Sequence, residues 1–236
     1  MGGLGVTWRS HLSDGTEVAV KRLTAPGGDL SPRLQRLRRL GGSGSANLLG
    51  LLSVFQEDGS FWAAFRLDDG VRLSQLLERG RMSPACALVV GTSVLDALVS
   101  LHGAGLWHGA VHGRNVHVGR DGAVRLGDYG LAGDRPGESP AALRAADVRA
   151  AGALVASALR MVAGRRPEGS LPRAVRAITG SSRLLPAGYE AALASLTLRE
   201  GARGMATVRR QERARAQLAT MVAETMVEEG EARLVP

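Results

Sequence analysis

Residues 101–115 read LHGAGLWHGAVHGRN, and residues 126–132 read LGDYGLA. The first stretch ends in Asn115, and Asp128 stands thirteen residues later, in the second stretch. An asparagine and an aspartate on neighbouring loops can together hold Mg²⁺ on a triphosphate, because this ion takes a few protein oxygens and leaves phosphate to supply others. The two stretches therefore predict a metal and phosphate site built from Asn115 and Asp128.

A third stretch, VAVK at residues 18–21, contains Lys21, the single lysine among the 30 lysine and arginine residues of the chain. Gly2, Gly3 and Gly5 precede it, and glycines let the backbone approach a phosphate closely. A lysine on a half-buried strand commonly just reaches solvent. A compact ammonium nevertheless serves a phosphate pair where the planar fork of arginine does not, so the one retained lysine favours phosphate binding.

The pattern of apolar and turn residues predicts an α+β fold. Its first part is mostly strands with one helix, which starts at Ser31-Pro32 and ends at the glycines after residue 40. Its later part is mostly helices, and such a division is typical of an α+β architecture. We expect strands at 5–9, 17–23, 48–56, 60–67, 116–119 and 124–126, and helices at 32–41, 73–79, 84–102, 209–227 and through much of the stretch after 141.

Taken together, these stretches resemble the protein kinases. Residues 18–21 resemble the strand that carries the phosphate-pairing lysine, residues 101–115 resemble the catalytic loop with the helix end before it, and residues 126–132 resemble the Asp-Phe-Gly motif, with Tyr129 in place of Phe. Similar motifs run in the same order over roughly residues 2–210. The histidine-rich catalytic loop is also similar to that of the aminoglycoside phosphotransferases, but residues 18–21 and 147–152 favour the protein-kinase branch.

The resemblance implies a bilobal protein-kinase-like fold with a small β-rich lobe and a mainly helical lobe. We expect the first lobe at 1–67, lacking its first strand, the second at 68–210, and a C-terminal helix and tail at 211–236. It also implies ATP and Mg²⁺ as cofactors, with Asn115 and Asp128 as metal ligands. The expected nucleotide-binding residues are Gly2, Gly3, Gly5, Lys21, Phe65, Arg66, Leu67 and Asp68, with Phe65 as the gatekeeper at the rear of the adenine pocket.

The sequence departs from the family at the groups that do the chemistry. Ala110 stands where the family has the catalytic aspartate, and losing a general base typically costs roughly 10²–10⁴ in rate. His112 is the one nearby side chain that could replace the base, although a solvated loop histidine is the simpler interpretation. The helix glutamate that normally pairs with the strand lysine is also missing, since its position falls near Arg36, so Lys21 should turn to Asp128.

These losses predict a pseudokinase that binds Mg-ATP and regulates or scaffolds a protein partner. One alternative is an active serine/threonine kinase with displaced catalytic groups, and another is a basic module that binds nucleic acid. The net charge of +8 carries little weight for the last, because an arginine-for-lysine bias of this size reflects composition rather than a binding face.

Composition also limits the setting of the protein. Neither long apolar stretch, 85–101 or 148–162, is long and uncharged enough for a membrane span, so we expect both to be core helices of a cytoplasmic protein. Cys86, the single cysteine, cannot form an internal disulfide, and we expect it to pack in the core. The four histidines between 102 and 117 have no cysteine or carboxylate among them to complete a zinc site.

Overall fold

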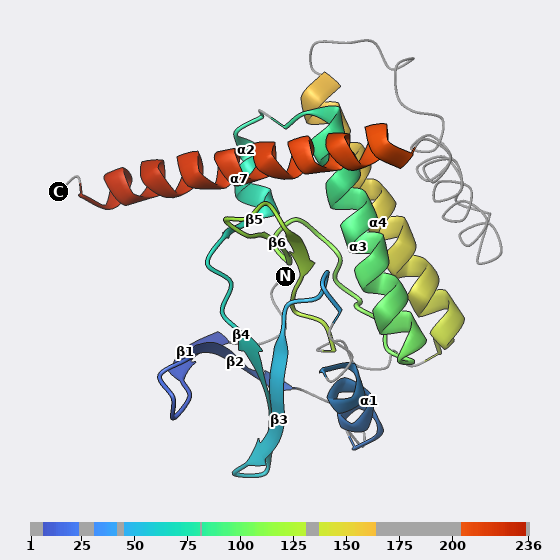
Figure 1. The fold of residues 1–236 in the computed structure, drawn as a ribbon. Helices are drawn as coiled ribbons and strands as arrows, with labels where there is room; N and C mark the ends of the chain where they lie inside the picture. Colours follow the sequence, from blue (N-terminus) through green and yellow to red (C-terminus); the bar gives the residue numbers. More distant parts are fainter. Residues whose placement is uncertain are drawn as a thin grey trace.

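The computed structural model of the chain describes residues 7–23, 31–41, 45–80, 82–130, 137–163 and 204–234. It is an α+β structure in which a four-stranded antiparallel sheet and one helix lie beside a group of helices with a small three-stranded sheet (Figure 1). The strand orders are β1-β2-β4-β3 in the first sheet and β5-β6-β7 in the second. The α+β class predicted from the sequence is thus found, while the lobe boundaries stay predictions.

The first sheet follows the predicted hairpins. The turn between β1 and β2 contains Gly15, whose φ of 81° suits glycine, and Asp14 caps this turn by accepting a hydrogen bond from the backbone of Thr16. The pairing of β3 with β4 shifts register between Leu51 and Ser53. The strands are β1 (Thr7–His11), β2 (Glu17–Leu23), β3 (Leu51–Glu57) and β4 (Ser60–Arg66).

Helix α1 (Ser31–Gly41) packs beside this sheet as its sequence predicts. Leu34, Leu37 and Leu40 are buried on one face, and the arginines occupy the remaining faces. Leu37 reaches the Asp128-Tyr129-Gly130 segment, since a methyl group added to Gly130 would lie 2.4 Å from its side chain. The helix is therefore packed directly against the predicted phosphate site.

The helical part is centred on α3, which contacts both α4 and α7. Gly91 lets α3 and α4 approach closely, because an added Cβ would lie 2.6 Å from Val155. Cys86 is fully buried where α3 meets α7, which confirms the predicted core role. The elements are β5 (Val71–Arg72), α2 (Leu73–Glu78), α3 (Pro84–Gly103), β6 (Val116–Val118), β7 (Val124–Leu126), α4 (Pro140–Ala163) and α7 (Gly204–Leu234).

Three features differ from the sequence prediction. Strand β5 was not expected, since two residues leave no alternating pattern. Helix α4 begins at Pro140, just before the helical stretch predicted after 141, because proline is well suited to the first turn of a helix. Helix α7 is 31 residues long and extends well beyond the predicted 209–227. The part of the predicted helical stretch that falls at 164–203 lies outside the described residues.

The sequence predicted that the apolar stretch at 85–101 falls short of a membrane span, but within the described residues the segment Ala85–Gly103 of α3 is long and apolar enough to cross one. However, 61% of the segment is buried inside the protein. Its side chains join the main hydrophobic cluster, as expected of a core helix.

Candidate nucleotide site

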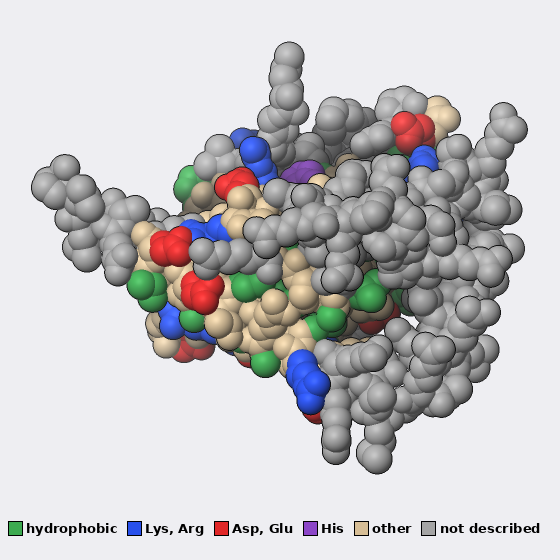
Figure 2. Space-filling view, turned by 90° about the horizontal axis from the view of Figure 1, so that it is seen from above, with side chains coloured by type: hydrophobic (Ala, Val, Ile, Leu, Met, Phe, Trp, Pro, Cys, Tyr) green, Lys and Arg blue, Asp and Glu red, His purple; other side chains and the backbone are tan. Residues whose placement is uncertain are grey.

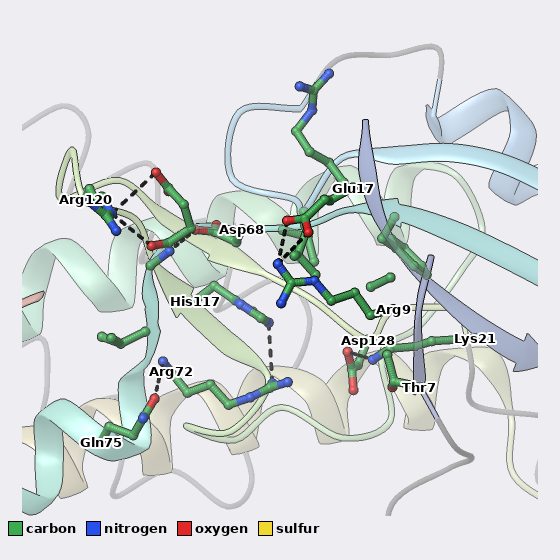
Figure 3. Close-up of a pocket in the computed structure, with 18 of the residues that line it drawn as sticks. Thr7, Arg9, Glu17, Lys21, Asp68, Arg72, Gln75, His117, Arg120 and Asp128 are labelled. Carbon is green, nitrogen blue, oxygen red and sulfur yellow. Dashed lines mark hydrogen bonds and ion pairs between the residues drawn. The ribbon is translucent and has the colours of Figure 1, made fainter. Parts of the chain in front are cut away.

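A cavity of about 1040 Å³ lies between the first sheet and the strands β5–β7 (Figure 3). Ala19, Leu49 and Phe65 give it an apolar wall, and charged side chains of both signs line the remainder. The predicted site residues that line it are Lys21, Phe65, Arg66, Leu67, Asp68 and Asp128. Gly2, Gly3 and Gly5 lie outside the described residues.

Lys21 and Asp128 form an ion pair inside this cavity. Strand β2 points Lys21 inward, where it is only 7% exposed, and Asp128 follows β7 with a φ of 59°. Left-handed backbone is uncommon for residues other than glycine but is tolerated by aspartate. Helix α1 contains no acidic residue, and Lys21 turns to Asp128 as expected.

Asn115 is linked to the Asp128 loop but does not line the cavity. Its backbone carbonyl accepts a hydrogen bond of 2.7 Å from the amide of Gly127, the residue before Asp128. Its side-chain amide donates to the carbonyl of Ala110 at 2.9 Å and is mostly buried. The structure thus brings the two predicted metal ligands onto adjoining loops, with Asp128 alone facing the cavity.

Asp147 of α4 fixes the loop that carries Ala110 through hydrogen bonds. The Asp147 carboxylate accepts hydrogen bonds from the amides of His108 and Gly109, both at 2.7 Å, and its Oδ2 lies 3.0 Å from Nε2 of His102. Burial by itself would raise the pKa of Asp147, but these hydrogen bonds outweigh it and lower the pKa. The carboxylate is therefore charged, and it fixes the loop without reaching the cavity.

His108 is fully buried and neutral. Its Nε2 lies 2.7 Å from the carbonyl of Gly127 and donates to it, while Nδ1 accepts a hydrogen bond from the amide of Ala110 at 3.2 Å. Burial lowers the pKa of His108, although the bond to Gly127 and the charge of Asp147 oppose this shift. The ring thereby ties the loop of Ala110 to the loop of Asp128.

The possible surrogate base, His112, lies in a different cavity from Lys21 and Asp128. It lines a second cavity of about 480 Å³ together with Leu77 and Leu154, and its Nε2 lies 3.5 Å from the side-chain amide of Asn115. His112 does not line the cavity that contains Lys21 and Asp128. The structure thus gives no support to His112 as a base in that cavity.

Arg36, the position expected to correspond to the missing glutamate, does not contact Lys21 among the described interactions. Its guanidinium donates instead to the carbonyl of Gly105 at 3.3 Å, and its aliphatic stem packs on the same glycine. Helix α1 is thereby attached to the segment that leads into the Ala110 loop.

Phe65, which lines the cavity, packs against a second aromatic ring, that of Tyr129. Phe65 is 1% exposed, and its ring meets that of Tyr129 edge to face, with centroids 5.2 Å apart. The hydroxyl of Tyr129 donates a 2.6 Å hydrogen bond to the carbonyl of Leu49, and burial raises the pKa of Tyr129. Phe65 thus lines the cavity and packs in the core, while its role as a gatekeeper stays a prediction.

Several charged residues of the cavity were missed by the sequence analysis. Arg9 and Glu17 pair across the first hairpin at 2.6 Å, and Arg72 and His117 lie on the opposite side (Figure 3). Glu17 and Lys21 are four residues apart on β2, so they share one face of the strand, which could have indicated that Glu17 faces the cavity. Arg72 lies on the undetected β5, and the sequence carries no signal for its partner His117.

No known protein-family model matches this sequence. The chain is nevertheless similar to curated serine/threonine-protein kinases. It is 27% identical to sid1 of Schizosaccharomyces pombe over 135 residues, which cover 56% of this chain and 29% of sid1. It is 28% identical to PknH of Mycobacterium tuberculosis over 137 residues, covering 56% of this chain and 22% of PknH.

A shorter match, 38% identical over 65 residues, links the chain to PknL of Mycobacterium tuberculosis and covers 28% of this chain and 16% of PknL. The chain thus spans less than a third of the length of each of these three relatives. The α+β structure is compatible with a kinase-like fold. The chain is therefore similar to the serine/threonine protein kinases over about half of its length.

Proposed function

We propose that this chain is a pseudokinase domain, which binds Mg-ATP in the large cavity and regulates or scaffolds a protein partner rather than transferring phosphate efficiently. The observation that carries the proposal is the content of the cavity. Lys21 and Asp128 are present there to meet phosphate and metal, whereas position 110 is alanine and His112 lies elsewhere. A site that keeps its binding groups without its base is suited to binding.

Asp128 and Asn115 would hold the magnesium ion. The Asp128 side chain faces the cavity and is 25% exposed, so it fits a ligand of a phosphate-bound cation. Asn115 lies on the adjoining loop, and its side chain, which donates to the carbonyl of Ala110, would have to turn toward the cavity to place its amide oxygen on the ion. When bound, the ion would neutralise phosphate charge, and Lys21 would exchange its contact with Asp128 for one with a phosphate oxygen.

Thermal unfolding with and without Mg-ATP tests this proposal, on the chain and on Lys21→Met. At 100 times Kd, a ligand that binds only the folded state stabilises it by about 2.7 kcal/mol, which raises Tm by several degrees in a domain of this size. We expect the shift in the chain and its loss in Lys21→Met. A folded chain whose Tm does not respond to ATP would contradict nucleotide binding and leave an interaction module.

The retained Lys21–Asp128 pair also favours a second candidate, a weakly active serine/threonine kinase. Phosphate transfer that is abolished by both Lys21→Met and Asp128→Ala would establish it. Turnover restored by Ala110→Asp alone would show that the base is the only loss that matters. We expect Ala110→Asp to remain weak, because α1 offers Lys21 no glutamate.

A further inference from the structure

The guanidinium of Arg72 points into the large cavity and is held there by neutral groups (Figure 3). It donates to the carbonyl of Arg114, the residue before Asn115, and its Nη1 lies 3.4 Å from Nε2 of His117. The imidazole in turn packs on Gly127, where an added Cβ would lie 3.0 Å from Nε2. Arg72 thus lies in the cavity beside the two loops that carry the predicted metal ligands, Asn115 and Asp128.

The charge of Arg72 is not balanced in the way that neighbouring charges are. Lys21 pairs with Asp128, Arg9 with Glu17 at 2.6 Å, and Arg120 with Asp69 at 3.7 Å. No ion pair joins Arg72 to a carboxylate in the part of the chain that the structure describes. A cavity that holds a cation in place without a counter-ion is prepared for an anionic ligand.

His117 orients this cation without bringing a negative charge to it. An arginine nitrogen can only donate, so Nε2 of His117, which lies 3.4 Å from Nη1 of Arg72, is the acceptor of that contact. An imidazole nitrogen that accepts carries no negative charge, so the guanidinium keeps its own charge for a ligand.

We propose that Arg72 is a phosphate-binding residue of the cavity, and that it lets the site bind a nucleotide without a divalent metal. This inference rests on the proposed function and extends it. The positive charge of Arg72 would neutralise part of the phosphate charge that Mg²⁺ otherwise neutralises. The planar fork of Arg72 can give two parallel N–H donors to a phosphate, with Lys21 as a point charge on the same ligand.

Calorimetric titrations with ATP, ADP and adenosine, each in EDTA and in Mg²⁺, test this role on the chain, Arg72→Gln and Arg72→Lys. One charge-assisted hydrogen bond is worth about 1.5–3 kcal/mol, so Arg72→Gln should weaken ATP binding in EDTA roughly 10- to 100-fold. Adenosine binding should stay unchanged, and Arg72→Lys should restore part of the loss. Arg120→Gln is the matched control, because Asp69 already compensates that charge.

The outcomes separate the two proposals. If the chain binds no nucleotide in either buffer, the proposed function fails. If the chain binds ATP but requires Mg²⁺, or if Arg72→Gln binds ATP in EDTA as well as the chain does, nucleotide binding stands and the role of Arg72 is overturned. Tighter ATP binding by Arg72→Gln would also overturn it, since the side chain would then occupy space that the ligand needs.

Discussion

At the scale of single residues, the cavity depends on imidazoles that remain uncharged. His108 is buried in the loop beneath it, His117 lies on its floor, and the pKa of each is lowered chiefly by burial. In an unfolded chain both rings would titrate at the ordinary value of 6.5. Folding therefore holds both rings deprotonated at pH values where the free side chains would be charged.

This difference predicts an acid-labile protein. Below pH 6.5 these histidines bind protons in the unfolded chain but not in the folded chain. The unfolding free energy should therefore fall as the pH drops toward 4, by up to about 1.4 kcal/mol per pH unit for each histidine. Urea denaturation at several pH values measures the slope. His117→Leu should make the fall shallower between pH 6.5 and 4, and an unchanged slope in this variant would show that His117 titrates normally.

At the scale of elements, one carboxylate joins three segments of the chain. Asp147 of α4 receives hydrogen bonds from His102 at the end of α3 and from two amides of the Ala110 loop. A buried charge with three donors is costly to disturb, because removing the charge leaves those donors poorly satisfied. The position of the loop relative to α3 and α4 therefore depends on Asp147.

We expect Asp147→Asn to lower the unfolding free energy by at least about 2 kcal/mol, since hydrogen bonds to a charged group are worth about 1.5–3 kcal/mol. The pKa of Asp147 is lowered by folding, so its contribution is present above its ordinary value of 3.8 and is lost as the pH falls below it. The variant should thus have a lower unfolding free energy at neutral pH. Its unfolding free energy should also fall less steeply than that of the unsubstituted chain as the pH drops below 3.8.

Asp96→Asn on α3 is the control for this prediction. Asp96 is exposed, and the burial that it does experience raises its pKa instead of lowering it. Its replacement should change stability by less than about 0.5 kcal/mol. Equal effects of the two substitutions would mean that the hydrogen bonds of Asp147 contribute nothing net.

At the scale of the whole molecule, α7 connects distant parts of the fold. It packs along α3, and its Arg215 carbonyl meets the turn between β6 and β7, where a Cβ on Gly122 would lie 2.0 Å from that oxygen. Further along, Met226 lines the large cavity and Glu228 pairs with Arg79 beyond α2. The C-terminal helix is therefore part of the surroundings of the candidate site.

Comparing the stability losses of Gly122→Ala and Gly15→Ala measures how firmly α7 is packed against the turn between β6 and β7. Both glycines have φ near +80°, at 74° and 81°, so alanine should cost each about 1–2 kcal/mol. Only Gly122 also faces a clash, which adds about 1–3 kcal/mol. Chemical denaturation should show the larger loss for Gly122→Ala, and equal losses would indicate that α7 yields easily at this turn.

Charge is distributed without a dominant basic face on the side seen in Figure 2, where basic and acidic side chains lie next to one another among the described residues. Recognition of nucleic acid depends on a clustered basic surface. Among the described residues of this face, the mixture of signs gives the nucleic-acid alternative no support.

The sequence predicted those parts of the molecule that depend on local pattern. The strand of Lys21, the leucine face of α1 and the pairing of Lys21 with Asp128 follow from alternation, helical spacing and the lack of an acidic residue in α1. The roles of Arg72 and His117 do not, because they depend on β5 pairing with β6, which brings residues 72 and 117 opposite each other. Such a pair is set by tertiary contacts that no single stretch encodes.

The two tryptophans on the first sheet have an optical consequence. Trp8 and Trp62 meet edge to face with centroids 5.2 Å apart and planes at 66°, so their indole transitions should couple and give a paired band in circular dichroism. Trp8 lies between Thr7 and Arg9, which both line the large cavity, so a hairpin that moves over a bound ligand would change the band. Trp107 is buried in a separate cluster with Leu143 and would contribute a constant background. A change in this band on addition of a ligand would report movement of the hairpin, without any attached dye.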